Sequence, residues 1–231
     1  MKKLMWIISF IALAGTAIVL PYMPDSVPMH YDMSGNIDRW GSKYENMIFP
    51  IIILIMALFW TLFIRYYDRK AEEASNEKES AGSRSNAKVI GIVGLCTAVM
   101  FTVMQGFLLY GSYTEAISGA ERETVDIGRV TCILMGILFI VIGNFMTKTR
   151  INSNVGVRVR WSRYNETTWR KSNRFGAIAF IIAGVLTILT AFFMKNSFAA
   201  VMIAVFYIIL ASIASVAYAH RVYRKEKAEG R

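Results

Sequence analysis

The chain has 231 residues, of which 55% are hydrophobic and only 18% are charged, and its mean hydropathy is +0.42. Soluble domains are less apolar and more charged than this, so the composition excludes an ordinary soluble protein. The formal net charge is +10, and the placement of that charge along the chain is informative about topology.

Six long uncharged stretches follow one another along the sequence, at residues 4–22, 46–64, 89–114, 130–147, 175–194 and 196–219. Each is close to the ~20 residues that an α-helix needs to cross a ~30 Å hydrocarbon core. Helices are expected because backbone amides in lipid must bond within their own segment. The sequence therefore predicts an all-α integral membrane protein with six transmembrane helices that crosses the cell membrane several times.

Lysine and arginine are concentrated on one side of these predicted helices. Of the 26 such residues, 21 fall at the N-terminus, in the second and fourth connections, or in the C-terminal tail. Cytoplasmic loops of membrane proteins carry the excess of basic residues. We therefore expect both termini in the cytoplasm and the first connection outside the cell. The basic side suits anionic lipid headgroups, and direct nucleic-acid binding is not needed to explain it.

We expect the chain to divide into two units. Residues 1–70 form a two-helix unit with a proline-rich extracellular loop, and residues 71–87 form a charged cytoplasmic linker rich in serine and alanine. Residues 88–231 form a four-helix unit with a basic cytoplasmic loop at 147–174.

Few polar side chains occur within the predicted helices. Gln105 and Asn144 are costly in lipid unless they bond to another helix, so we expect both to join helices. Asp126 and Arg129 lie three residues apart, directly before the fourth stretch, and should pair with each other.

The first extracellular loop reads "MPDSVPMHYDMSGNIDRWGSKY" (23–44). Its prolines favour extended backbone in the residues before them. The "SGN" that follows suits a turn, in which Gly35 and Asn36 can adopt positive φ. The loop is therefore expected to be structured.

Two interpretations of the polar side chains in this loop stay open. His30, Asp32 and Asp38 could converge on a divalent cation such as Zn²⁺, Mn²⁺ or Ca²⁺. Alternatively, His30 bonds to loop backbone while Asp25 and Asp32 stabilise turns; in that case we expect no cofactor.

The basic cytoplasmic loop reads "INSNVGVRVRWSRYNETTWRKSNRFGA" (151–177) and interleaves aromatic residues with Arg158, Arg160, Arg163, Arg170 and Arg174. One interpretation is a docking face for an acidic segment of a cytoplasmic protein. The other is a short helix lying on the inner leaflet, with Trp161 and Trp169 in the interface.

Both loops resemble one family. The outer stretch is similar to the N-terminal domain of SdpI-family membrane proteins, which reads approximately L-P-[DE]-x-[IV]-P-x-H, then G-x-x-D-x-[WY]-G-S-K. The matching residues are Pro24, Asp25, Pro28, His30, Gly35, Asp38, Trp40, Gly41, Ser42 and Lys43.

The inner stretch is similar to the C-terminal signature of the same family. Its matching residues are Asn152, Gly156, Arg158, Trp161, Ser162, Trp169, Lys171, Ser172 and Arg174. The chain departs from the signature at Ile151 and Arg160, where the family has prolines, and at Asn173, where it has a histidine.

The resemblance implies an immunity protein of the bacterial cell membrane that protects its host from a membrane-active peptide toxin met at the outer face. It also implies capture of a cytoplasmic repressor at the inner face. Two other functions stay open: a metal-dependent membrane peptidase that uses the outer His and Asp, and a small transporter of peptide or ion. The chain has no H-E-x-x-H motif, which argues against the peptidase. It also has no mid-membrane carboxylate, which argues against the transporter. An oligomer is compatible with each of these functions.

Overall fold

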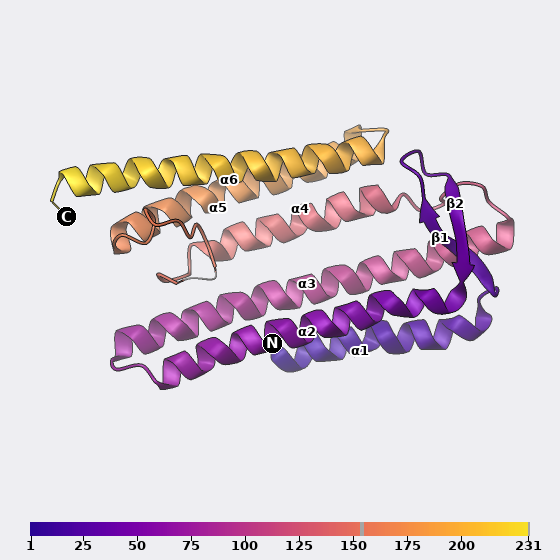
Figure 1. Cartoon of the computed structure of the whole chain (residues 1–231), viewed down its shortest axis with the longest axis horizontal. Helices are drawn as coiled ribbons and strands as arrows, with labels where there is room; N and C mark the ends of the chain where they lie inside the picture. The colour runs from indigo at the N-terminus through magenta and orange to yellow at the C-terminus, as the bar shows by residue number, and fades with distance from the viewer. Residues whose placement is uncertain (153–154, 231) are drawn as a thin grey trace.

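The computed structural model describes residues 1–152 and 155–230 and consists mainly of six long helices that run alternately up and down (Figure 1). The helices are α1 (Lys2–Val19), α2 (Ile48–Glu72), α3 (Glu77–Ser118), α4 (Ile127–Met146), α5 (Glu166–Phe193) and α6 (Ser197–Ala228). Each is long and apolar enough to cross a membrane. The prediction of a mostly helical, multi-pass membrane protein is confirmed.

Side-chain caps set the starts of four of these helices. Asn76, Asp126, Asn165 and Asn196 each accept a hydrogen bond from the backbone N–H three residues later. Such caps satisfy amides that have no partner inside the helix. Polar capping residues therefore mark where these four helices begin.

The helices pack as two adjoining groups, α1–α2–α3 and α4–α5–α6, with α3 against α4 (Figure 1). The approach of α4 to α5 depends on glycine. A Cβ on Gly136 would lie 2.7 Å from the carbonyl oxygen of Gly184, and a Cβ on Gly184 would lie 2.6 Å from that of Gly136. Small residues allow helix backbones to come this close in a membrane.

The connection between α1 and α2 contains a β-hairpin. Strand β1 (Ser26–Tyr31) pairs antiparallel with β2 (Ile37–Ser42), so that Ser26 lies opposite Ser42 and Tyr31 opposite Ile37. Short 3₁₀ turns, η1 (Leu20–Tyr22) and η2 (Lys43–Met47), join the hairpin to the flanking helices. The extended backbone was predicted from the prolines, whereas the strand pairing was not.

The charged segment 71–87 is mostly helical. α2 continues to Glu72 and α3 begins at Glu77, so only four residues, 73–76, connect them. The segment is rich in alanine and glutamate, which favour helix, and Asn76 caps the start of α3. The Ser80 hydroxyl also donates to the carbonyl of Ala71 across the turn, at 2.8 Å.

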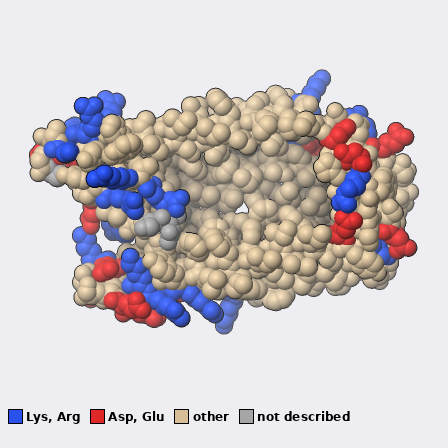
Figure 2. Space-filling model, in the orientation of Figure 1, with Lys and Arg blue, Asp and Glu red and all other residues tan. Residues whose placement is uncertain are grey.

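The two ends of the bundle differ in charge. The hairpin end carries β1, β2 and the α3–α4 connection, with many of the acidic side chains visible in Figure 2. The basic end carries the C-terminus, the α2–α3 turn and the α4–α5 connection, and lysine and arginine gather there, whereas the N-terminus lies nearer the middle of the bundle's length because α1 is short (Figure 1).

Candidate functional site

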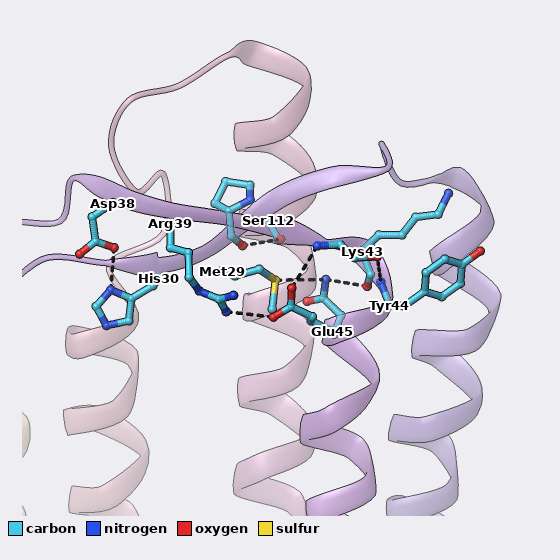
Figure 3. Close-up of polar contacts among 11 residues, drawn as sticks. Met29, His30, Asp38, Arg39, Lys43, Tyr44, Glu45 and Ser112 are labelled. Carbon is cyan, nitrogen blue, oxygen red and sulfur yellow. Dashed lines mark hydrogen bonds and ion pairs between the residues drawn. The ribbon is translucent and has the colours of Figure 1, made fainter.

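The hairpin is bonded to the last turns of α3. The Ser112 hydroxyl donates to the carbonyl of Pro28 at 3.1 Å (Figure 3). The Tyr31 hydroxyl donates to Glu115 Oε2 at 2.6 Å. Both bonds join residues that are 84 positions apart in the sequence. The hairpin therefore lies on the end of the bundle as a fixed cover.

Glu115 is the centre of this attachment and is only 1% exposed. Besides the Tyr31 hydroxyl, its carboxylate accepts the Thr124 backbone N–H at 2.6 Å and the Thr124 hydroxyl at 3.0 Å. A buried carboxylate is tolerated when donors surround it in this way. Burial and the bond to Glu115 together raise the pKa of the Tyr31 phenol.

Glu115 was not singled out from the sequence. Its position three residues after Ser112 and four after Gly111 places all three on one face of α3. That small-residue face was the available signal for a buried position.

The α3–α4 connection also holds the turn of the hairpin. It makes an antiparallel bridge between Asn36 and Arg122. The bonds around this bridge run from Ile37 N–H to the Glu121 carbonyl (2.9 Å), from Glu123 N–H to the Gly35 carbonyl (2.8 Å), and from Arg122 Nη2 to the Ser34 carbonyl (2.8 Å). Gly35 has φ +78°, and a Cβ there would meet the Glu123 carboxylate at 2.7 Å. The positive φ predicted for Gly35 is confirmed. Asn36 does not have a positive φ, because among the described residues only glycines do.

Several motif residues build the corner between β2 and α2. Lys43 Nζ lies 2.9 Å from Asp25 Oδ1 and donates to the Met23 carbonyl at 3.2 Å. The Ser42 side chain and Glu45 form a capping box, and Glu45 also pairs with Arg39 at 2.9 Å. A Cβ on Gly41 would meet the Glu45 carboxylate and Met29. Of the motif prolines, Pro24 is half-buried and Pro28 is buried.

His30 and Asp38 lie together on the exposed side of the hairpin, with Nδ1 and Oδ1 2.6 Å apart (Figure 3). Asp32 is occupied elsewhere, since its carboxylate accepts the N–H groups of Ser34 and Asn36 and the Asn36 side-chain amide. These bonds, the Asn36 side chain first, lower the Asp32 pKa. Thus only two of the three candidate metal ligands come together, and within residues 1–152 and 155–230 no group of three His, Cys, Asp or Glu could hold an ion.

The inner motif forms a second built region, at the basic end. Asn152 donates through Nδ2 to the carbonyls of Arg150 and Val155, at 2.6 and 3.1 Å. Gly156 has φ +101°, and a Cβ there would overlap Asn173 Oδ1. The polypeptide here is folded closely against α5.

Asn173 stands where the family signature has a histidine, and it is 1% exposed. Its Oδ1 accepts the Val157 N–H at 2.8 Å, and its Nδ2 donates to the Trp169 carbonyl at 3.0 Å. One amide thus supplies both an acceptor and a donor, so the loop is held to α5 without an imidazole.

Trp169 is buried inside the protein, at 3% exposed, and its indole N–H donates to the Thr149 carbonyl at 3.0 Å. It belongs to the first turns of α5 rather than to a short helix lying on the leaflet, so that interpretation is wrong for this residue. Trp161 packs on His220 of α6, with ring centroids 4.5 Å apart. Ser162 is fully buried and donates to the carbonyls of Val157 and Val159.

The basic side chains of the inner motif remain at the surface. Arg158, Arg160, Arg163, Arg170, Lys171 and Arg174 are all exposed. Lys171 pairs at 2.8 Å with Glu226 of α6, whose carboxylate is almost buried. These exposed cations therefore surround buried and packed aromatic side chains, including Trp161 and Trp169.

Helix α3 contacts both motif regions. At its start, the Ser85 hydroxyl donates to the Lys148 carbonyl at 2.7 Å, and Asn86 Oδ1 accepts the Arg150 N–H at 3.1 Å. At its other end are Ser112 and Glu115, described above. A single helix therefore joins the hairpin to the basic loop.

Comparisons with known proteins place both motifs in described sequence families. Residues 148–218 match the SdpI/YfhL protein family, and residues 7–66 match a domain of unknown function, DUF1648. The chain is 22% identical over 211 residues to a Bacillus subtilis (strain 168) protein named "Immunity protein SdpI", covering 91% of this chain and 90% of that protein. No solved structure matches the chain. The resemblance predicted from the two motifs is confirmed.

Proposed function

We propose that this chain, whose sequence is similar to SdpI-family proteins along most of its length, is a membrane immunity protein that protects its host from a membrane-active peptide toxin. The observation that carries the proposal is the similarity to an immunity protein over 91% of the chain, which includes both motifs. Protection of this kind requires binding or exclusion of a peptide. It requires no catalytic group.

The hairpin supports the binding role. Its attachment to α3 and to residues 119–126 makes it a rigid surface, which lowers the entropic cost of binding a partner. His30, Asp38 and Trp40 lie on its exposed side, and Trp40 is 45% exposed. An exposed tryptophan beside acidic groups suits an amphipathic, cationic peptide.

The proposal includes a sidedness. The hairpin end faces the exterior, and the basic end and both chain termini face the cytoplasm. The supporting observation is that 21 of the 26 lysine and arginine residues fall at the N-terminus, in the second and fourth connections or in the C-terminal tail, as the positive-inside rule requires of the cytoplasmic side.

The basic end has a proposed role as a docking face for an acidic segment of a cytoplasmic protein, such as a repressor. The exposed arginines of the inner motif supply the charge. Trp161 and Tyr164, packed on His220 and Tyr223 of α6, hold the surface in shape.

The test is protection in a host that lacks the gene. Expression of the chain should lower the host's sensitivity to at least one membrane-active peptide produced by neighbouring bacteria. Sensitivity is measured as survival across a panel of such peptides. Replacing Trp40 with alanine and Asp38 with asparagine should abolish most of the protection. Met33→Ala, a change at a still more exposed residue of the hairpin turn, should leave the protection intact.

Equal amounts of each variant in the membrane must be verified by immunoblot. Unchanged survival with and without the parent chain, for every peptide in the panel, would refute the immunity role.

A further inference from the structure

A groove of about 550 Å³ lies between the start of α1 and the second half of α2. Its floor and walls are apolar and include Trp6, Ile7 and Phe10 of α1. Its rim is formed by Lys2 and Lys3 of α1 and by Arg65 of α2. Neither motif contributes to it.

The groove lies at the level where the apolar part of both helices ends. Lys2 and Lys3 directly precede the apolar residues of α1, and Arg65 directly follows the run that ends at Ile64 in α2. Cations at this position meet lipid headgroups, while the apolar wall below them faces acyl chains.

The wall is held in shape by contacts within the protein. The Trp6 indole N–H donates to the Thr61 hydroxyl of α2 at 3.0 Å, so the ring spans the two helices. The Phe10 ring lies 5.9 Å from the Trp6 ring and extends the wall by one turn. Phe10 and Ile7 are more than half exposed, which leaves their faces open to an acyl chain.

The rim has an excess of positive charge. Lys2 Nζ pairs at 2.8 Å with Oδ2 of Asp68, which lies beside the groove and neutralises one of the three cations. The three cations therefore leave a net charge of about +2, which one phosphate-containing headgroup can complement.

We propose that this groove binds an anionic phospholipid of the surrounding membrane, with its headgroup at Lys3 and Arg65 and an acyl chain along Trp6, Ile7 and Phe10. Lys2, held by Asp68, forms the side of the headgroup site. The site requires neither the immunity role nor a particular sidedness, because it rests only on the groove and its charges.

The experiment is native mass spectrometry of the full chain in detergent, titrated with dioleoyl phosphatidylglycerol and, separately, with dioleoyl phosphatidylcholine. Phosphatidylglycerol should bind at least about tenfold more tightly, since each basic residue near an anionic headgroup contributes roughly fivefold in affinity. The double variant Lys3→Gln and Arg65→Gln should bind phosphatidylglycerol roughly 25-fold more weakly and phosphatidylcholine unchanged.

The matched control is Arg69→Gln with Lys70→Gln, which removes the same charge from exposed positions on α2 that do not line the groove. It should retain the preference. Asp68→Asn changes affinity in the opposite direction, because it frees Lys2 and should tighten phosphatidylglycerol binding several-fold. This gain cannot come from misfolding.

Equal affinity of the parent for the two lipids would overturn the proposal. So would an equal loss in the two double variants, or an Asp68→Asn chain that binds phosphatidylglycerol no more tightly than the parent.

Discussion

Buried polar side chains with complete sets of partners connect the elements of this protein. Glu115 receives three hydrogen bonds from the hairpin and from Thr124, and Asn173 both accepts from the basic loop and donates within α5. A buried polar group that lacks a hydrogen-bond partner costs more free energy than a solvent-exposed polar group, which can bond to water. These few residues therefore specify where the two loops lie.

Gly156 is a residue at which a single added methyl group should be costly. Its φ of +101° is unfavourable for any side chain, and the Cβ would overlap Asn173 Oδ1. Gly156→Ala should lower the free energy of unfolding by roughly 1 to 3 kcal/mol. Thermal unfolding in detergent measures this.

The matched control is Gly106→Ala in α3, where a Cβ would meet no atom within 4 Å. Alanine is favoured over glycine in a helix by up to about 1 kcal/mol, so this variant should be as stable as the parent or more so. If the Gly156→Ala and Gly106→Ala variants unfolded at the same temperature, the expectation of strain at position 156 would be contradicted.

Glu123 should make stability depend on pH. Its pKa is raised above the ordinary value of 4.5, first because burial disfavours its charge and then because Asp126 lies nearby. The folded state therefore binds this proton more tightly than the unfolded state, and stability rises as pH falls through the raised pKa toward 4.5. Glu123→Gln should be more stable than the parent at about pH 7 and should lose this part of the pH dependence.

Thermal unfolding between about pH 4.5 and about pH 7.5 tests this expectation. Glu121→Gln removes the same charge from an exposed position two residues earlier and should keep the parent's slope. A Glu123→Gln chain with an unchanged slope would show that the carboxylate is ionised at no cost in the folded protein.

At this scale the sequence predicted motif residues but not their partners. The Asp126–Arg129 pair was predicted from spacing and is confirmed at 3.2 Å. The Tyr31–Glu115 bond was not, because it joins residues 84 positions apart that only the packed bundle brings together. Asn144 was expected to join helices, but its side chain is exposed.

At the scale of elements, the helices were predictable because each needs only a long apolar run, which is a local property. The hairpin was not predicted. Pro28 lies within β1, and proline is tolerated only where a strand needs no N–H for pairing. Residues 119–126 and α3 complete the hairpin's hydrogen bonds. These partners are distant in the sequence, so no local pattern could predict them.

Gln105 joins three elements, as its polarity within an apolar stretch predicted. Its Nε2 donates to the Thr16 hydroxyl of α1 at 3.0 Å and to the Asn46 carbonyl of η2 at 3.2 Å. Gln105→Met keeps the volume and removes both bonds, so it should destabilise the α1–α2–α3 group by about 1 kcal/mol. Unfolding in a detergent titration measures the loss.

Thr102 provides the comparison, one turn earlier on the same helix. Its hydroxyl is buried without a hydrogen-bond partner in the described part of the chain. Thr102→Val should therefore leave stability unchanged or improve it. If the two variants were destabilised equally, the contribution of the Gln105 bonds would be refuted.

At the scale of the whole molecule, the sidedness proposed from charge can be tested with an impermeant thiol reagent on intact cells. Ser34 is exposed in the hairpin turn and Arg163 is exposed at the basic end, so each is replaced by cysteine in a separate variant. We expect labelling of the Ser34→Cys variant and protection of the Arg163→Cys variant. Cys96 and Cys132, both within helices, are first replaced by alanine.

Permeabilised cells are the control, because both variants should then be labelled. Ser162 would be a poor choice at the basic end, since it is fully buried. If intact cells were labelled with the Arg163→Cys variant but not with the Ser34→Cys variant, the proposed sidedness would be reversed.

The length of α3 has a mechanical consequence. Its 42 residues extend about 63 Å at about 1.5 Å per residue, roughly twice the thickness of the hydrocarbon core. A helix is stiff along its axis, so α3 is a stiff connection between the hairpin contacts at Ser112 and Glu115 and the basic-loop contacts at Ser85 and Asn86. A glycine pair at mid-length would make that connection more flexible while leaving the contacts at each end in place.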